Sequence, residues 1–228
     1  MPTAQKITWV AADTPVTGPL TKFGGQPHWL QTPQWPLSKT TGNPMRFIGQ
    51  IALKPPMFQG YQAKMAYLFI TDEPSAYISG TWAPDGGENA VILQPNGRYT
   101  GRTANLDTGP TLYRMQEHPG IGQVTPEPVE FLAALTQAQE PEFVAEQERS
   151  GWSQQAHECY TQALAGNKVG GTPCFLQGDE FPRGKNWQLL LQLDSTRVPF
   201  HVNFGDAGVA YAFINPHATQ GKLLWQGC

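Results

Sequence analysis

The sequence predicts an α+β fold that is strand-rich and mostly antiparallel, with internally duplicated halves and a short helical insert. Three observations lead to this prediction. The 228 residues include 24 glycines and 21 prolines, about a fifth of the chain where about 12% is usual, so many turns and short elements are expected. The apolar runs are short and bounded by turn residues, as in buried strands. Two distant segments also carry the same motifs in the same order.

The shared motifs form three blocks. The first is Lys-x-Gly-Gly-x-Pro, at 22–27 and again at 168–173. The second is an apolar run with one glutamine, at 47–53 and 189–194, and the third is Ala-Tyr-x-Phe-Ile, at 66–70 and 210–214. We therefore predict a single domain over 1–228, with related halves at about 20–75 and 166–217. The alternative is that Gly-Gly pairs and aliphatic runs recur by chance in a glycine-rich chain.

The strands are predicted from the same blocks. The glutamine-containing runs indicate buried strands at 47–53 and 188–193. In the third block aromatic residues alternate with smaller ones, which places the aromatic pair on one face of a strand. Linking strands are expected within about 82–115, at 90–93, 99–103 and 111–115. The turn Pro95-Asn96-Gly97 favours a hairpin between the first two of these.

The helical segment is expected at about 126–165. Its first helix would begin with Thr125 as the cap, Pro126 at the first helical position and an apolar face from Val129 to Leu135. A second helix is expected from 141 to 148. A third would follow Ser153 as its cap, turn Ala156, Tyr160, Ala163 and Leu164 inward, and stop at Gly166-Asn167.

Composition and charge exclude several classes of function. The net charge is −3, and no Lys/Arg-rich run occurs, so nucleic acid is not expected as a partner. No stretch approaches 18 consecutive apolar residues and the start carries no apolar export signal, so we expect no membrane association and a cytoplasmic location. Three widely spaced cysteines fit reduced thiols. The five histidines lie far apart in the sequence, so neither a metal site nor a cofactor is expected.

The motif set as a whole resembles a known family. It comprises Lys22-Phe23-Gly24-Gly25-x-Pro27, Trp35-Pro36, Phe47-Ile48-Gly49-Gln50-Ile51, Gly170-Gly171-x-Pro173, Leu189 to Asp194, Gly205-Asp206-Ala207-Gly208 and Tyr211-x-Phe213-Ile214. From about residue 20 to 225 this pattern resembles the YwqG-like family of bacterial proteins. The resemblance implies an α+β, strand-rich fold of duplicated halves and a bacterial cytoplasmic setting. The family is uncharacterised, so the resemblance implies no activity, cofactor or catalytic residue.

The lysines that precede the paired glycines are the first candidate binding groups. Adjacent amides in the pairs Gly24-Gly25 and Gly170-Gly171 can form an anion-binding nest beside Lys22 and Lys168, one in each half. A small anionic ligand, carboxylate or phosphate, would fit such a site. The alternative is that the glycines serve a tight turn and the lysines are solvated.

Two glutamines and two aspartates complete the candidate binding cleft. Gln50 and Gln192 fall inside apolar strands, where a buried amide needs partners, and loop backbone or the floor of a cleft between the halves would supply them. Asp194 and Asp206 are the best acidic candidates for acid–base or cation chemistry if they converge. The alternative is that each aspartate bonds its own turn.

Seven tryptophans form a further group. Most of them, including Trp29 and Trp35, are expected to cap a core that loops alone would not cover. Any two that line an open groove would become binding anchors.

Two functions remain compatible with these sequence features. The first is a non-enzymatic cytoplasmic binding or protein-interaction module with a protein partner, because the chain offers turns, aromatics and amides but no convergent catalytic set. The second is a small-molecule-binding enzyme of hydrolase type, with Lys22, Lys168, Asp194 and Asp206 in a cleft between the halves.

Overall fold

A computed structural model describes residues 1–73, 77–118 and 123–228, and a ten-stranded antiparallel sheet dominates them. The order across the sheet is β14-β13-β12-β11-β1-β10-β2-β4-β5-β6. In chain order these strands are β1 (Thr3–Ala11), β2 (Lys22–Gly24), β4 (Arg46–Ala52), β5 (Met65–Ile70), β6 (Asn89–Gln94), β10 (Glu130–Gln139), β11 (Lys168–Gly170), β12 (Gln188–Asp194), β13 (Val209–Ile214) and β14 (Gly221–Gln226).

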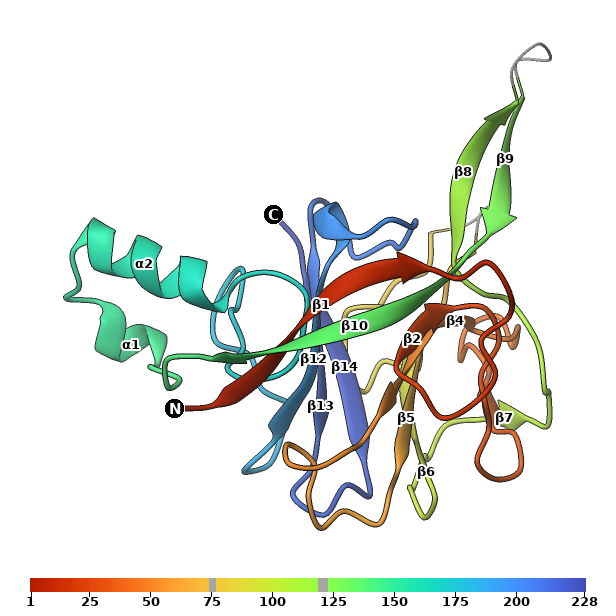
Figure 1. Cartoon of the computed structure of the whole chain (residues 1–228), viewed down its shortest axis with the longest axis horizontal. Helices are drawn as coiled ribbons and strands as arrows, with labels where there is room; N and C mark the ends of the chain where they lie inside the picture. Colours follow the sequence, from red (N-terminus) through yellow and green to blue (C-terminus); the bar gives the residue numbers. More distant parts are fainter. Residues whose placement is uncertain (74–76, 119–122) are drawn as a thin grey trace.

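The two edge strands of this sheet, β6 and β14, come together, so the sheet curves into a nearly closed barrel (Figure 1). Gly221 allows the approach, because a Cβ atom at this position would lie 2.4 Å from Val91 Cγ1 on β6. The seam between β6 and β14 is therefore also the line along which the first and second halves of the chain meet.

Strands such as β5 and β6 are buried on both faces, whereas β1 and β10 are only partly buried. The strand periodicity explains how both faces are covered. Alternate residues of β5 and β13, such as Leu68 and Ala212, belong to the largest hydrophobic cluster. The residues between them face the other side, where Tyr67 packs in a second cluster and Tyr211 in a third. The predicted aromatic faces of these strands are confirmed, as are the predicted strands at 47–53, 90–93 and 188–193.

The predicted helix after Thr125 is wrong. Residues Gln123–Pro128 form strand β9 and residues 130–139 form β10. The whole of β1 pairs with β10, from Thr3 opposite Gln139 to Ala11 opposite Phe131. This pairing, together with burial of Phe131 in the core, outweighs the helix-start signal, because tertiary context overrides local propensity.

The rest of the helical segment is partly as predicted. The third helix is confirmed as α2 (Gln154–Leu164), whose cap Ser153 accepts a hydrogen bond from the Ala156 amide at 3.2 Å. Of its expected inward residues only Leu164 is buried, so α2 covers little of the core. The second helix is a single turn, α1 (Glu146–Arg149), which starts later than expected. Among the described residues, no helix has the length and apolar character that crossing a bilayer requires.

The linking region differs from the prediction in two places. The turn at 95–97 exists, with Asn96 at φ 68°, but the chain does not return along β6; the Arg98 amide instead donates to the Thr219 carbonyl. Within the predicted strand 99–103 only Thr103 is extended, in β7 (Thr103–Ala104), which pairs with β3 (Trp35–Pro36). The predicted end of the first half at 74–75 lies outside the described residues.

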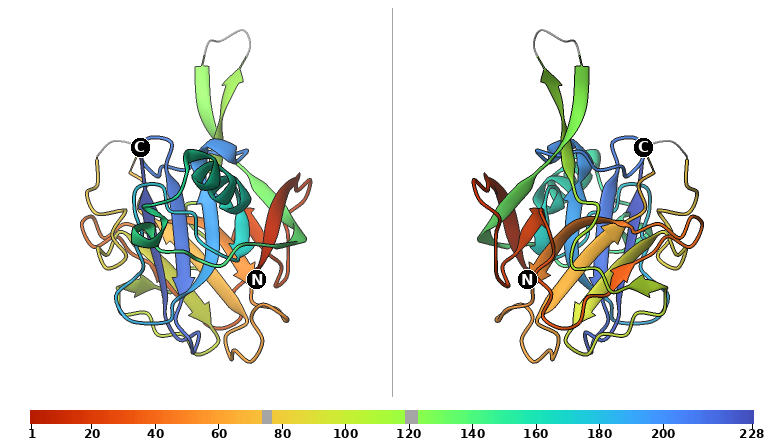
Figure 2. Two further views of the ribbon diagram at one scale, coloured as in Figure 1. Left: turned by 90° about the vertical axis from the view of Figure 1, so that its left-hand side faces the viewer. Right: turned by 90° about the vertical axis from the view of Figure 1, so that its right-hand side faces the viewer.

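A two-stranded ribbon projects from the body of the molecule (Figures 1 and 2). It consists of β8 (Tyr113–His118) and β9, with Tyr113 opposite Pro128 at its base. The strand predicted at 111–115 is the beginning of β8. The ribbon and the two helices lie at different ends of the molecule in Figure 1.

Candidate functional site

The first Gly-Gly turn holds a carboxylate that belongs to the chain itself. The ammonium of Lys22, which is 1% exposed, donates to Glu130 Oε1 at 2.5 Å and to the Val16 carbonyl at 3.0 Å. The Val16 amide donates to the other oxygen of Glu130 at 3.2 Å. A Cβ atom at Gly25 would lie 2.3 Å from Glu130 Cδ, so the turn accepts the carboxylate only because it carries no side chain there.

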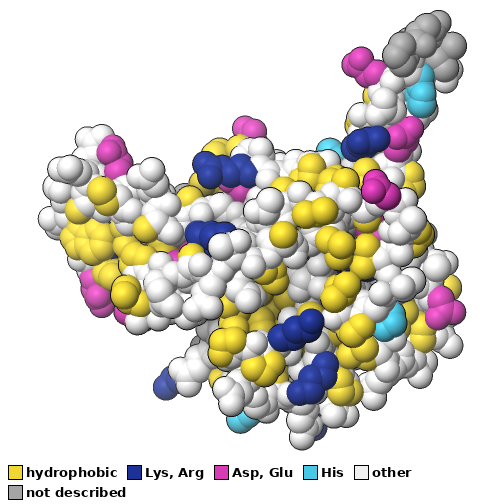
Figure 3. All heavy atoms as spheres, viewed as in Figure 1, with side chains coloured by type: hydrophobic (Ala, Val, Ile, Leu, Met, Phe, Trp, Pro, Cys, Tyr) yellow, Lys and Arg dark blue, Asp and Glu magenta, His cyan; other side chains and the backbone are white. Residues whose placement is uncertain are grey.

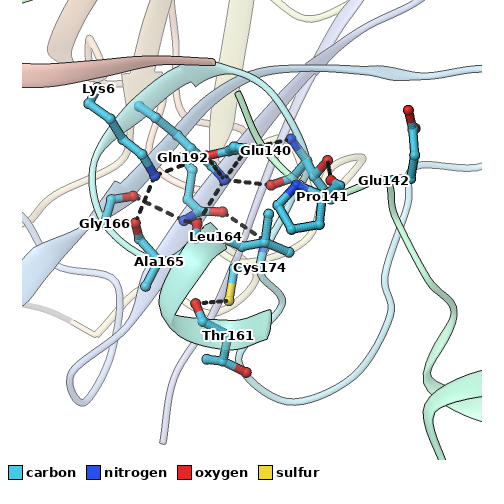
Figure 4. A network of polar contacts seen from close by, with 12 residues as sticks. Lys6, Glu140, Pro141, Glu142, Thr161, Leu164, Ala165, Gly166, Cys174 and Gln192 are labelled. Atoms are coloured by element: carbon cyan, nitrogen blue, oxygen red, sulfur yellow. Dashed lines mark hydrogen bonds and ion pairs between the residues drawn. The ribbon is translucent and has the colours of Figure 1, made fainter. Parts of the chain in front are cut away.

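The second Gly-Gly turn repeats this arrangement more tightly (Figure 4). Lys168 is fully buried, and its ammonium donates to both oxygens of Glu140, at 2.9 and 2.8 Å. The Thr172 amide donates to Glu140 Oε2 at 2.9 Å, and Lys6 from β1 pairs with Oε1 at 2.9 Å. A Cβ atom at Gly171 would lie 2.3 Å from Glu140 Oε2. Burial lowers the pKa of Lys168 to about 8, and the glutamate opposes this shift.

Each lysine site therefore binds a carboxylate, but this carboxylate belongs to the chain itself. Glu130 is the first residue of β10, and Glu140 directly follows its last residue. The alternative expectation of solvated lysines is wrong, since both are buried. Sequence reasoning missed Glu130 and Glu140 because they lie over 100 and 28 residues from their lysines. The available signal was an acid at each end of an apolar run of strand length.

Gln50 and Gln192 bind loop backbone, which confirms the structural expectation for them. The Gln50 amide accepts from the His28 N–H at 2.8 Å and donates to the Leu20 carbonyl at 2.9 Å. Gln192 accepts from the Cys174 N–H at 2.8 Å and donates to the Leu164 carbonyl at 3.1 Å. Both side chains are buried within the strands.

Two further glutamines with the same role were not predicted. Gln94, at the end of β6, accepts from the amides of Leu30 and Gln31. Gln226, at the end of β14, accepts from the amides of Leu176 and Gln177. Each therefore holds the loop that follows a Gly-Gly turn.

The two candidate aspartates have different surroundings. Asp194 caps the 3-10 turn η1 (Ser195–Arg197), accepting from the Thr196 amide at 2.9 Å and its hydroxyl at 2.6 Å. It is thus a turn residue. Asp206 is exposed and lines an open hollow of about 550 Å³.

This hollow lies beside Trp225 of β14. It is lined by Trp82, Gln177, Glu180, Gly205, Asp206, Trp225, Gln226, Gly227 and Cys228. A smaller hollow of about 110 Å³ adjoins it at Gly205 and Trp225, and its other lining residues are Thr71, Asp72, Glu73, Tyr77, Ile78, Thr81 and Asn203. We call the two hollows together the tryptophan groove. Trp82 comes from the loop that precedes β6. Residues 71–73 fall in the first predicted half and Gln177 and Glu180 in the second, so the groove combines residues of both.

Aromatic rings and acids dominate the tryptophan groove. The rings of Trp82 and Trp225 stand at 80° to each other with centroids 6.3 Å apart, and Trp82 is 41% exposed. Within the part of the chain that the structure describes, the charged side chains that line the two hollows are all acidic: Asp72, Glu73, Glu180 and Asp206. Only Asp72 has an ion-pair partner among the described residues, Arg46 at 2.6 Å. The groove therefore presents uncompensated negative charge next to indole rings.

The other tryptophans that the sequence singled out are structural. Trp35 is fully buried, and Trp29 packs against it at 6.3 Å between ring centroids. They cap the second hydrophobic cluster, as expected.

A separate hollow of about 170 Å³ lies on the seam between β6 and β14. Arg98, Tyr99 and Lys222 line it, and Lys222 is paired with Asp85. None of the residues predicted for a cleft between the halves line this hollow, whose lining residues fall within 84–101 and 220–222, outside both predicted halves. Within the described parts of the chain, His, Cys, Asp and Glu form no group of three able to hold a metal ion. On the face shown in Figure 3, charges of both signs are scattered.

Comparison with known proteins identifies the family to which the chain belongs. No curated protein matches the chain. A family model described as a domain of unknown function (DUF1963) matches residues 21–222, nearly the whole sequence and all of the sheet except β1 and the last residues of β14. The chain therefore belongs to the DUF1963 family of domains of unknown function.

Proposed function

We propose that this chain is a non-enzymatic, cytoplasmic binding module that recognises a protein partner. The observation that carries the proposal is the tryptophan groove, in which Trp82 stands 41% exposed beside Trp225. Partly exposed tryptophans in a hollow are the residues that most often anchor protein interfaces. The other polar candidates, Lys22, Lys168, Gln50 and Gln192, have all their contacts inside the fold.

We further infer that the domain covers the whole chain, is of the YwqG-like bacterial type, and arose by duplication of one half. The matched contacts support this inference. In each half a lysine before two glycines meets a glutamate of the 130–140 segment. In each half a strand glutamine accepts from the residue after the motif proline, His28 or Cys174. Duplicated sequences that keep such contacts form a pseudo-symmetric pair.

A small anionic ligand is not part of the proposal. The glycine turns that would bind it are filled by Glu130 and Glu140, and the tryptophan groove is acidic. The enzyme alternative now depends on Asp206 alone, because Lys22, Lys168 and Asp194 are engaged in internal contacts.

The test is capture of the tagged full chain from its native host at native abundance, followed by native mass spectrometry. A stoichiometric protein partner supports the proposal. A chain that emerges without a protein partner but with a retained small molecule, and that turns this molecule over, contradicts it and supports the enzyme. In that case Asp206→Asn would abolish turnover without lowering thermal stability.

A further inference from the structure

The tryptophan groove has features that select the charge of its occupant. Its two indole rings stand nearly perpendicular and pack in a T-shaped contact, with centroids 6.3 Å apart. Gly205, at φ 76°, lies against Trp225, and a Cβ atom there would be 2.7 Å from Trp225 Cζ3. The backbone of Gly205 thus packs against the six-membered ring of Trp225, which keeps this side chain in place before any ligand arrives.

Charge at the groove has one sign. Glu180 accepts a hydrogen bond from Gln226 at 3.1 Å, which holds its carboxylate at the wall, but no cation neutralises it among the described residues. Asp206 likewise has no side-chain partner there. Glu73, in the adjoining hollow, accepts from two neutral donors among the described residues, Thr41 and Asn43. A cation in the groove is attracted by the negative charge of the carboxylates and also by the quadrupole of the indole rings.

The shape of the groove indicates an extended ligand. The two hollows share Gly205 and Trp225, and carboxylates lie in both of them. A small ligand with one ammonium group would occupy only one of the two hollows. A chain with several cationic side chains reaches Asp206 and Glu180 in the larger hollow and Glu73 in the smaller one.

We propose that the tryptophan groove binds a basic peptide segment of the partner protein, with a lysine or arginine side chain seated against the exposed surface of Trp82 and beside Trp225. The inference rests on the proposed binding function and specifies the chemistry of the partner. It assigns Trp82 as the aromatic anchor, and Asp206 and Glu180 as the groups that neutralise the cation.

The probe for the test is an acetylated, amidated hexalysine peptide, titrated by calorimetry into the full chain at low and at high salt. We expect saturable one-to-one binding that weakens as salt rises. Trp82→Ala should weaken it by roughly 2- to 30-fold, the range of a cation–π contact. Because Trp82 is 41% exposed, the thermal midpoint of this variant should stay near that of the unaltered chain, so the loss reports on binding.

The matched control separates a specific site from general attraction to an acidic protein. Asp206→Asn and Glu148→Gln change the net charge equally, but Glu148 is exposed on α1 and lines neither hollow of the groove. Asp206→Asn should weaken hexalysine binding several-fold and Glu148→Gln should leave it unchanged. Equal effects of the two variants, or no effect of Trp82→Ala, would overturn the proposal.

Two further outcomes are decisive. If lysine amide alone binds as tightly as hexalysine, the groove is a site for a small cation and the peptide assignment is wrong. If Trp82→Ala still captures the partner of the unaltered chain from the host, the binding function stands and the groove is not its interface. If Trp82→Ala loses the partner and Glu148→Gln retains it, the result supports both the binding function and the groove as its interface.

Discussion

Glu130 and Glu140 lie at the two ends of β10, and each receives a hydrogen bond from a buried lysine that precedes a Gly-Gly turn. Glu130 is the first residue of the strand, and Glu140 directly follows its last. Because β10 also pairs along the full length of β1 and with β2, one strand joins both glycine turns to the centre of the sheet. A strand that links these contacts should be a main determinant of stability.

Removing the charge of Glu140 should be costly. Glu140→Gln leaves the ammonium of Lys168 buried without its counter-ion, and breaking a buried pair in this way costs about 3–5 kcal/mol of unfolding free energy. Denaturant unfolding measures the loss. Glu142→Gln, two residues on, removes the same charge from a side chain that is 72% exposed, and should change stability by less than about 0.5 kcal/mol. Equal effects of the two variants would show that the pair does not stabilise the fold.

The lowered pKa of Lys168 predicts how stability changes in alkali. Burial brings the folded-state pKa to about 8, whereas an unfolded lysine titrates near about 10.4. Between these values the unfolded chain binds more protons, so this group makes stability rise with pH from about 8 to about 10. Lys168→Met should lack this contribution. Unfolding free energies of both chains across this window check it, and parallel curves would contradict the assignment.

The sequence predicted those parts of the fold that depend on local pattern. Gln50 and Gln192 mark strands that are buried along all but their end residues, and Ser153 caps a real helix. The Lys-Gly-Gly blocks were predicted to bind an anionic ligand, and each of them instead holds a carboxylate of the chain itself. Their occupants could not be predicted, since Glu130 reaches Lys22 across 108 positions, and no local pattern encodes such a pairing.

The helix prediction after Thr125 failed for a related reason. A cap residue, a proline and an acid in the first turn form a strong local signal, but β1 offers a complete partner strand. The sequence predicted the tryptophan groove only in part. A role as binding anchors was expected for any two tryptophans in a groove, but the meeting of Trp82 with Trp225 depends on how the barrel closes.

The surroundings of Glu88 predict that the free energy of unfolding falls in acid. This buried carboxylate accepts from the hydroxyls of Ser38, Thr40 and Thr71, each at 2.7 Å. Burial would raise the pKa of Glu88, but the hydrogen bonds outweigh it and hold the pKa below its ordinary value. Its stabilisation is therefore present above about pH 4.3, the unfolded value, and is lost as pH falls through the folded value.

Glu88→Gln tests this contribution. The amide would turn a donor toward hydroxyls that already donate, which costs roughly 1–3 kcal/mol at neutral pH. The difference in unfolding free energy between the variant and the unaltered chain should shrink as the solution is acidified below about pH 4.3. A difference that stays constant into acid would mean that the charge of Glu88 does not contribute.

Gly25→Ala tests whether the first glycine turn exists to receive Glu130. Gly25 and Gly42 both have positive φ, 61° and 76°, but a Cβ atom at Gly25 would meet the Glu130 carboxylate, and at Gly42 it would meet nothing within 4 Å. Both alanines pay about 1–2 kcal/mol for the left-handed backbone. Gly25→Ala should cost a further 1–3 kcal/mol or so, because it overpacks a buried contact and displaces the carboxylate from Lys22. Thermal or denaturant unfolding of the two variants gives the difference directly. If both lose the same stability, the glycine at position 25 serves only the turn, and the carboxylate does not require it.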